Sequence, residues 1–277
     1  VAEFTKIRES VDYSRRKLQP FREQRLSALR SYVGFHYSDT GSGDKMPINL
    51  LEMAISIYRR QLAAQTPRVL ITSKVEKLKP AAMSFEIVMN KMLDEIDFGT
   101  TLQNWVMDAL FSIGVMKIGI SPDDEKSAEL EGWMRDPGTV FAETIDLDDF
   151  VVDMTARKWD QAEYIGNRYT LLYDYIKESD IFGDQTNKLN PQPMQSTNEQ
   201  GDEKSQTLSI GQDRSQADAS QRTVELWDVW LPYQNKFVTF QADQDGSIRD
   251  DLVLREVEWE GPEEGPYHIL SYGEVPG

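Results

Sequence analysis

Residues 102–120, LQNWVMDALFSIGVMKIGI, mark the point at which the sequence changes from helical to β character. Apolar residues recur at helical spacing up to Phe111, and Gly114 ends the pattern. The apolar run Val115–Ile120 that follows has the length and composition of a strand. This junction predicts an α+β fold, with amino-terminal helices before it and a mostly antiparallel β region after it.

Two helices are predicted at the start of the chain. The first covers the first thirty-odd residues, whose apolar side chains alternate with charged ones at helical spacing, and Pro20 should kink or divide it. The second runs from about 48 to 65 with Asn49 as a candidate N-cap. Residues 69–72, VLIT, then predict a short strand.

A third helix begins at Pro80, which suits a first helical turn, and ends near Phe98. Its inward-facing residues are expected to be Met83, Ile87, Met92, Leu93 and Ile96. Thr100 or Thr101 is expected to cap the helix that leads into the junction.

After the junction, the sequence alternates short apolar runs with turn residues, as antiparallel strands do. The strand candidates are 139–145, 150–152, 163–169, 224–231, 237–240, 252–254 and 267–272, with a short helix over 171–177. The pair Asp245-Gly246 predicts a hairpin turn. Both faces of the 224–231 strand look partly covered, and core packing is the first interpretation of Trp227 and Trp230.

Composition divides the chain into three parts. An α+β body covers 1–184, a polar low-complexity loop or insertion covers 185–222, and a β-hairpin region over 223–277 completes the body. The tract 185–221 is rich in Gln, Asn, Ser and Asp and contains no aromatic residue, which predicts a peripheral excursion. We also expect further sequence beyond Gly277.

The charge of the chain is strongly negative and unevenly distributed. The net charge is −17 with a pI of about 4.6, which argues against tight nucleic-acid binding, because such binding relies on Lys and Arg. Val1–His36 contains eight basic and four acidic residues, whereas Asp180–Gly277 contains seven and nineteen. Solvated helix and loop surfaces explain this asymmetry, and so does a contact between neighbouring subunits of opposite local charge.

The sequence contains no motif that carries a known chemistry. A phosphate-binding loop, a dinucleotide fingerprint and a nucleophile elbow are all missing, and there is no cysteine. His36 and His268 have no second ligand at metal-binding spacing. We therefore predict no catalytic, cofactor-binding or metal-binding residue, no cofactor and no enzymatic activity.

Three acidic clusters contain carboxylates of the kind that bind metal ions, but none has the spacing of a metal site. Asp123 and Asp124 form a contiguous run that would diverge rather than converge on one ion, so a solvated turn is predicted. The cluster around Phe150 lacks a glycine-centred calcium loop, and so does 243–246. The members of the cluster around Phe150 are Asp146, Asp148, Asp149 and Asp153.

Five stretches, taken in order, resemble portal proteins of tailed double-stranded-DNA bacteriophages. They are Asn49–Pro67 (helix, then a proline-containing exit that leads into a strand), Trp105–Ile118 (helix, glycine, strand), Ile145–Asp153 with Asp160–Ile165 (acidic strand and its successor), Val224–Leu231 (tryptophan-containing strand) and Gly265–Leu270 (approach to the stem). The resemblance lies in their order, and it covers nearly the whole sequence.

The resemblance implies a structural subunit of a ring, usually a dodecamer, at one capsid vertex of the virion, assembled in the host cytoplasm. Such a ring forms the channel for genome packaging and ejection. It is also the platform for terminase and tail adaptors, and it contacts the major capsid protein and scaffold. DNA would pass through without tight binding, and no membrane is involved. This chain would correspond to most of the wing, with the stem, clip and crown beyond Gly277.

Two alternatives remain open at this point. One is another virion structural protein, such as a head-tail adaptor. The other is a metal-dependent nuclease that uses one of the acidic clusters.

Overall fold

The computed structural model describes residues 2–34, 49–63, 65–121, 139–182, 184–193, 222–243 and 245–272. They form helices and antiparallel strands, so the predicted α+β class is confirmed. The chain separates into two compact units. Unit 1 takes Val1–Lys45 and Leu147–Gly265, and unit 2 takes Met46–Asp146 and Pro266–Pro276.

This division differs from the one predicted from composition, which places all of 1–184 in one body. Both units are discontinuous in sequence: strand β9 (Tyr267–Leu270) pairs with β1 (Gly114–Ser121) and so belongs to unit 2. Composition follows the order of the chain, whereas strand pairing joins segments about 150 residues apart. A linear division therefore could not find these units.

Unit 1 is built on a six-stranded antiparallel sheet in which β3, β4, β6, β7 and β8 follow one another and β5 also pairs with β6. Its strands are β3 (Phe150–Val152), β4 (Ile165–Leu172), β5 (Gln192–Pro193), β6 (Arg222–Leu231), β7 (Lys236–Ala242) and β8 (Ile248–Glu258). Its helices are α1 (Ala2–Val33), α5 (Tyr173–Glu178) and the short 3-10 turns η3 (Leu147–Asp149), η4 (Trp159–Gln161), η5 (Asp180–Phe182), η6 (Asp184–Lys188) and η7 (Pro232–Gln234).

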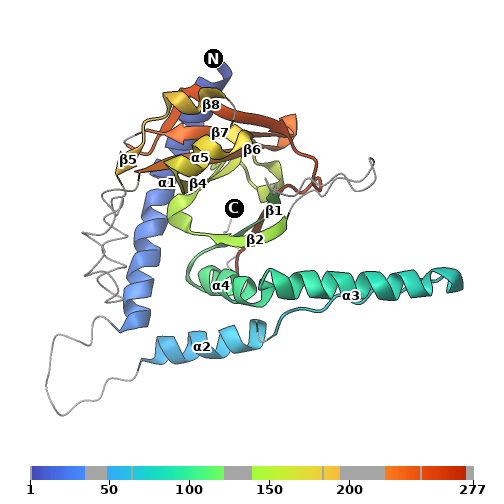
Figure 1. Ribbon diagram of the computed structural model, residues 1–277. Helices are drawn as coiled ribbons and strands as arrows, with labels where there is room; N and C mark the ends of the chain where they lie inside the picture. Colours follow the sequence, from blue (N-terminus) through green and yellow to red (C-terminus); the bar gives the residue numbers. More distant parts are fainter. Residues whose placement is uncertain are drawn as a thin grey trace, which may run out of the picture. The chain divides into compact units, whose positions relative to one another are not determined.

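The central strand β6 is covered on both faces, as expected from its sequence (Figure 1). On one face Trp227 packs with Val11 of α1, and on the other Leu226 packs with Ile176 of α5. Trp227 and Trp230 are both buried, which confirms the prediction that they are core residues. The predicted Asp245-Gly246 turn joins β7 to β8.

Helix α1 continues through Pro20, so of the two expected effects, a kink or a division, the division does not occur. Proline removes one backbone N–H and normally disrupts a helix interior. Here Leu18 is buried before Pro20, and Arg22 and Arg25 are buried after it. Packing on both sides of the proline therefore holds the two halves in one helix.

The start of the polar tract belongs to the folded body, which corrects the predicted boundary at 185. η6 lies within it, Leu189 is buried in the core beneath β6 and β8, and β5 pairs with β6. Pro193 lies directly opposite Arg222 in this pairing. Residues 194–221 lie outside the described residues, but the positions that flank them are adjacent strand partners.

Unit 2 consists of helices and a three-stranded antiparallel sheet of order β2-β1-β9. Besides β1 and β9, its elements are α2 (Leu50–Leu62), the 3-10 turn η2 (Glu76–Leu78), α3 (Lys79–Glu95), α4 (Phe98–Phe111) and β2 (Thr139–Ile145). Gly114 lies at the predicted helix-to-strand junction, where a Cβ atom would collide with the carbonyl oxygen of Trp105. The glycine thus permits the close approach of α4 and β1.

In unit 2, one local prediction is confirmed and two need correction. Asn49 caps α2 as predicted, accepting a hydrogen bond from the N–H of Glu52. α4, however, begins at Phe98 behind Asp97, whose φ of 48° turns the chain without a threonine cap. Residues 69–72 are extended but belong to no sheet, because side chains of α3 take the place of a partner strand.

Candidate functional site

The acidic residues near β3 have structural partners. Asp149 forms an ion pair with Arg168 at 2.8 Å. Asp153 accepts hydrogen bonds from the N–H and hydroxyl of Thr155 and the N–H of Glu163. Partial burial alone would raise the pKa of Asp153, but these hydrogen bonds lower it overall. Asp153 therefore organises the chain after β3 as a carboxylate.

No group of three or more acidic or histidine side chains suited to a metal ion occurs in the part of the chain that the structure describes. Asp146 belongs to unit 2, whereas Asp148, Asp149 and Asp153 belong to unit 1. Asp123, Asp124 and His36 lie outside the described residues. His268 lies in β9 opposite Met116.

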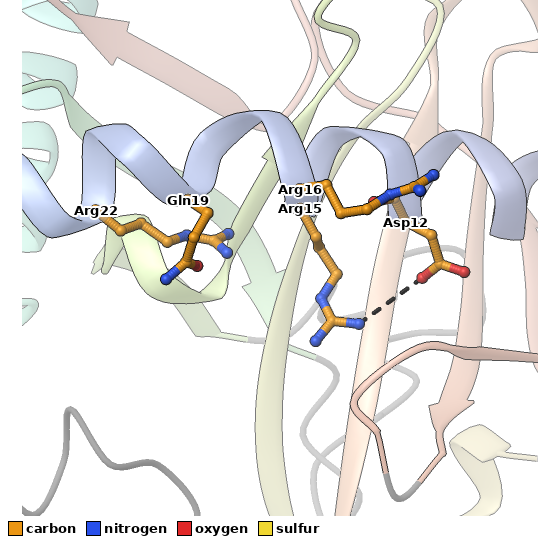
Figure 2. Close-up of a pocket in the computed structure, with 5 residues that line it drawn as sticks. All are labelled: Asp12, Arg15, Arg16, Gln19 and Arg22. Carbon is orange, nitrogen blue, oxygen red and sulfur yellow. Dashed lines mark hydrogen bonds and ion pairs between the residues drawn. The ribbon is translucent and has the colours of Figure 1, made fainter.

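An arginine-rich depression of about 620 Å³ lies on α1 (Figure 2). Asp12, Arg15, Arg16, Gln19 and Arg22 line it, and their spacing places them on one face of the helix. Arginines that converge on a depression are able to bind a carboxylate or phosphate group.

These arginines already bind acceptors of their own chain. Arg22 donates to the carbonyl oxygens of Leu147 and Phe150 at 3.1 Å. Arg15 donates to the carbonyl oxygen of Asp245 at 3.0 Å. Burial, and then the neighbouring positive charge of Arg168, lower the pKa of Arg15; burial also lowers that of Arg22.

This face of α1 therefore holds the helix against the sheet of unit 1 through hydrogen bonds. Asp250 of β8 accepts hydrogen bonds from Thr5 and Arg8, and Ser247 donates to Asp12. The basic amino-terminal helix and the acidic carboxyl-terminal region thus meet within one chain. Part of the opposite charge of the two regions is therefore paired within one subunit.

Helix α3 presents the most exposed apolar surface of unit 2. None of its side chains is buried. Met83, Phe85, Ile87 and Val88 are 57–68% exposed, so the prediction that Met83 and Ile87 face inward is wrong. Figure 1 shows α3 extending away from α4 as a long rod. The rod carries apolar residues that its own unit does not cover.

Helix α2 shows the same property. Ile55 is its one buried residue, and Arg59 donates a hydrogen bond to Gln103 of α4. The large apolar residues of α2 that are exposed are Leu50, Leu51, Met53, Ile57, Tyr58 and Leu62. We call these residues, together with Met83, Phe85, Ile87 and Val88 of α3, the open surface of unit 2.

The extended chain before α3 is held by side chains rather than by a strand. The side-chain amide of Asn90 accepts from the N–H of Val69 and donates to its carbonyl oxygen, both at 2.9 Å. Glu86 accepts from the N–H of Ile71 at 3.1 Å. Asn90 and Glu86 lie one helical turn apart and together imitate the edge of a strand.

Sequence reasoning missed this arrangement, although a signal for it was present. Glu86 and Asn90 are polar residues at i and i+4 on an otherwise apolar helix, next to an apolar extended run. Such a pair is able to satisfy backbone groups of a neighbouring segment. Its presence beside 69–72 would have favoured an extended segment over a sheet strand.

None of the described helices combines the length and the hydrophobicity of a membrane-crossing segment. The sequence matches no model of a known protein family and no curated protein sequence.

Proposed function

We propose that the chain is a structural subunit of the portal ring of a tailed double-stranded-DNA bacteriophage and has no enzymatic activity. The order of its elements supports this: a helix with a proline-containing exit, a helix-glycine-strand junction, an acidic turn with a short strand, and a tryptophan-containing strand follow the portal-like pattern. The strand that the pattern places after Pro67 is instead a segment outside any sheet. The observation that carries the proposal is the open surface of unit 2.

An exposed surface of this kind favours a subunit over an independent protein. An isolated helix of 17 residues is only marginally stable in water, and most helices are stabilised by packing of an apolar face. α3 has such residues without the packing. Extended apolar surface on a folded chain marks an interaction site. Neighbouring subunits in a ring would supply the missing contacts.

The charge of the chain agrees with a channel component. Duplex DNA is held mainly by basic residues that displace condensed counterions, and a net charge of −17 avoids that affinity. Two of the basic residues of α1, Arg15 and Arg22, already donate hydrogen bonds to the chain's own carbonyl oxygens. DNA that passes without being held is what translocation requires.

Native mass spectrometry and negative-stain electron microscopy of the intact protein test the proposal. We expect closed rings with a central hole and about twelve copies. A smaller or larger closed ring that joins a separate portal would instead favour a head-tail adaptor. Only monomers or dimers under all assembly conditions would contradict the proposal.

The nuclease alternative has its own assay. We expect DNA incubated with the protein and Mg²⁺ to remain intact, because no metal-binding group occurs among the described residues and Asp123 and Asp124 are contiguous. Cleavage that is lost on replacement of both aspartates by alanine would show an enzyme.

A further inference from the structure

Residues 68–73 form an extended segment with one satisfied edge and one open edge. In an extended chain the backbone N–H and C=O groups of successive residues point to opposite sides. The backbone groups of Val69 and Ile71 face α3, where Asn90 and Glu86 bind them. Those of Leu70 and Thr72 therefore face away from α3.

The outward edge is exposed and apolar. The Leu70 side chain is 78% exposed, and no hydrogen bond to the backbone of Leu70 or Thr72 occurs among the described residues. Open backbone groups beside an apolar side chain are the features by which a strand is added to an edge. Because α3 already fixes the segment in an extended form, little conformational entropy remains to be lost on pairing.

Charge decides which strand pairs with this edge. From Pro67 to Lys77 there are three basic residues and one acidic residue, in a chain whose net charge is −17. Antiparallel pairing with the same segment of a second copy, centred on Ile71, would place Arg68 opposite Lys74. Like charges in such positions are destabilising. The charge of the segment therefore favours pairing with an acidic edge strand over pairing with itself.

Strand β8 is the acidic edge of the unit 1 sheet. It pairs with β7 on one side, and no described strand pairs with its other side. From Ile248 to Glu260 there are five acidic and two basic residues. Glu258 is the last residue of β8 and Glu260 lies just beyond it, and both are exposed.

The opposite edge of the same sheet is closed. β3 has only three residues, its Val152 N–H binds the hydroxyl of Ser14, and its Phe150 carbonyl binds Arg22. Side chains of α1 thus seal the β3 edge in the way that α3 seals one edge of 68–73. β8 is the longer edge strand, with 11 residues. Side chains of α1 bind its Asp250, but among the described residues no strand pairs with its second side.

We infer that residues 68–73 of one copy add as a further strand to the free edge of β8 in a neighbouring copy. This contact joins two different surfaces head to tail, the kind of interface from which closed rings are built. The inference rests on the proposed ring function and identifies one contact that holds the ring together.

Leu70→Pro in the intact protein is the direct test. It removes an outward N–H and leaves the inward N–H groups of Val69 and Ile71 in place. At concentrations where the wild type forms rings, native mass spectrometry should show this variant as a monomer, with assembly weakened at least tenfold. Leu70→Ala is the matched control, because it shortens the side chain but keeps the N–H, and it should still assemble.

A charge exchange tests the pairing without altering the backbone. Arg68→Glu with Lys74→Glu should prevent assembly, and adding Glu258→Lys with Glu260→Lys to the same chain should restore it. The conservative exchange Arg68→Lys with Lys74→Arg should assemble like the wild type. Thermal melts of each variant confirm that the subunit is folded.

Mixing two assembly-deficient variants tests the head-to-tail geometry. The Leu70→Pro copy keeps an intact β8, and the Glu258→Lys/Glu260→Lys copy keeps an intact 68–73 segment. Together they should form a one-to-one dimer and nothing larger.

The outcomes separate this inference from the function on which it rests. Wild-type protein that never forms rings contradicts the proposed function. Wild-type rings together with folded Leu70→Pro rings contradict the inference alone. Failure of the charge exchange to restore assembly, or of the two variants to dimerise, shows that β8 is not the partner.

Discussion

The sheet of unit 1 and helix α3 of unit 2 are both rich in large apolar side chains, and they differ in what covers them. In unit 1, α1 packs on one face of β6 and α5 on the other, so that Trp227 is only 1% exposed. In unit 2, Phe85 of α3 is 57% exposed. The core residues of unit 1 are covered within that unit, whereas unit 2 leaves Met83, Phe85, Ile87 and Val88 of α3 exposed.

In both units, helix side chains bind the backbone edge of an extended segment, but with different results. Side chains of α1 close the β3 edge and so end the sheet of unit 1. Side chains of α3 close one edge of 68–73 and leave the other exposed. Edge closure protects a sheet from unwanted pairing. Closure on one side only leaves the other side of the segment open to pairing.

The largest effect is expected in the core of unit 1. Trp227→Ala should lower the free energy of unfolding by about 3–5 kcal/mol, because it leaves a cavity and removes the hydrogen bond from Nε1 to the carbonyl oxygen of Gly246. Denaturant melts measure the change. Trp159→Ala is the control, since Trp159 is exposed and its loss should cost less than 1 kcal/mol. Equal effects of the two changes would contradict the assignment of the core.

The hydrogen bonds between α1 and the sheet should contribute less to the free energy of unfolding than the Trp227 core does. Arg22→Ala removes two charged hydrogen bonds to the carbonyls of Leu147 and Phe150 and should lower stability by about 1.5–3 kcal/mol. Arg16→Ala, on the same helix, is the comparison and should change stability by less than about 0.5 kcal/mol. An Arg22→Ala variant with unchanged stability would show that α1 is held by its apolar contacts alone.

Asp153 should make stability depend on pH. Asp153→Asn should lower stability at pH 7 by about 1–2 kcal/mol, because a neutral amide with one acceptor oxygen replaces the charged carboxylate that accepts from Thr155 and Glu163. The folded pKa of Asp153 lies below its unfolded value. Its contribution is therefore complete above about pH 5 and is lost as the pH falls below about 4. Melts of both proteins should converge in that range, and a constant difference down to pH 2 would contradict this role.

Removal of residues 194–221 should have a small effect. Pro193 and Arg222, which flank these 28 residues, are paired strand neighbours, so a seven-residue Gly/Ser loop can join them. Shortening the loop fourfold should raise stability by at most about 1.2 kcal/mol. A deletion that also removes Leu189 is the contrast and should destabilise the core. Unfolding on the shorter deletion would show that the tract is part of the body.

The smallest effect on the isolated subunit is expected on α3. Phe85→Ser should change the free energy of unfolding of the monomer by less than about 0.5 kcal/mol, since Phe85 is largely exposed. Val106→Ser on α4 of the same unit, where the side chain is buried, should cost considerably more. Phe85→Ser should weaken ring assembly. A large loss of monomer stability would instead show that α3 is covered within its own chain.

Local signals in the sequence predicted most of the elements. The strand over 139–145 has the predicted bounds, Asn49 caps α2, and Gly114 separates α4 from β1 because a side chain there would collide with Trp105. These features depend on residues close together in the chain. Alternation, capping and glycine geometry are local, so a single sequence suffices to find them.

Predictions failed where distant contacts decide. Periodicity alone could not tell that Met83 and Ile87 of α3 are exposed while Met92 and Leu93 are half-buried. An amphipathic pattern states which residues share a face and not what covers it. Residues 69–72 have strand composition but are bound by Asn90 and Glu86. The division into units depends on β9 pairing with β1 across the sequence.

By itself, the sequence determined the α+β class, the acidic charge, the missing catalytic motifs and the buried tryptophans of β6, because propensity, patterning and composition carry this information directly. Only the tertiary structure decided which residues form hydrogen bonds with buried polar side chains. Asp228, in the middle of β6, is buried and accepts hydrogen bonds from the hydroxyls of Tyr169 and Thr239. A buried polar group is tolerated when distant residues satisfy it. For the same reason, only the tertiary structure showed that the outward edge of 68–73 is left open.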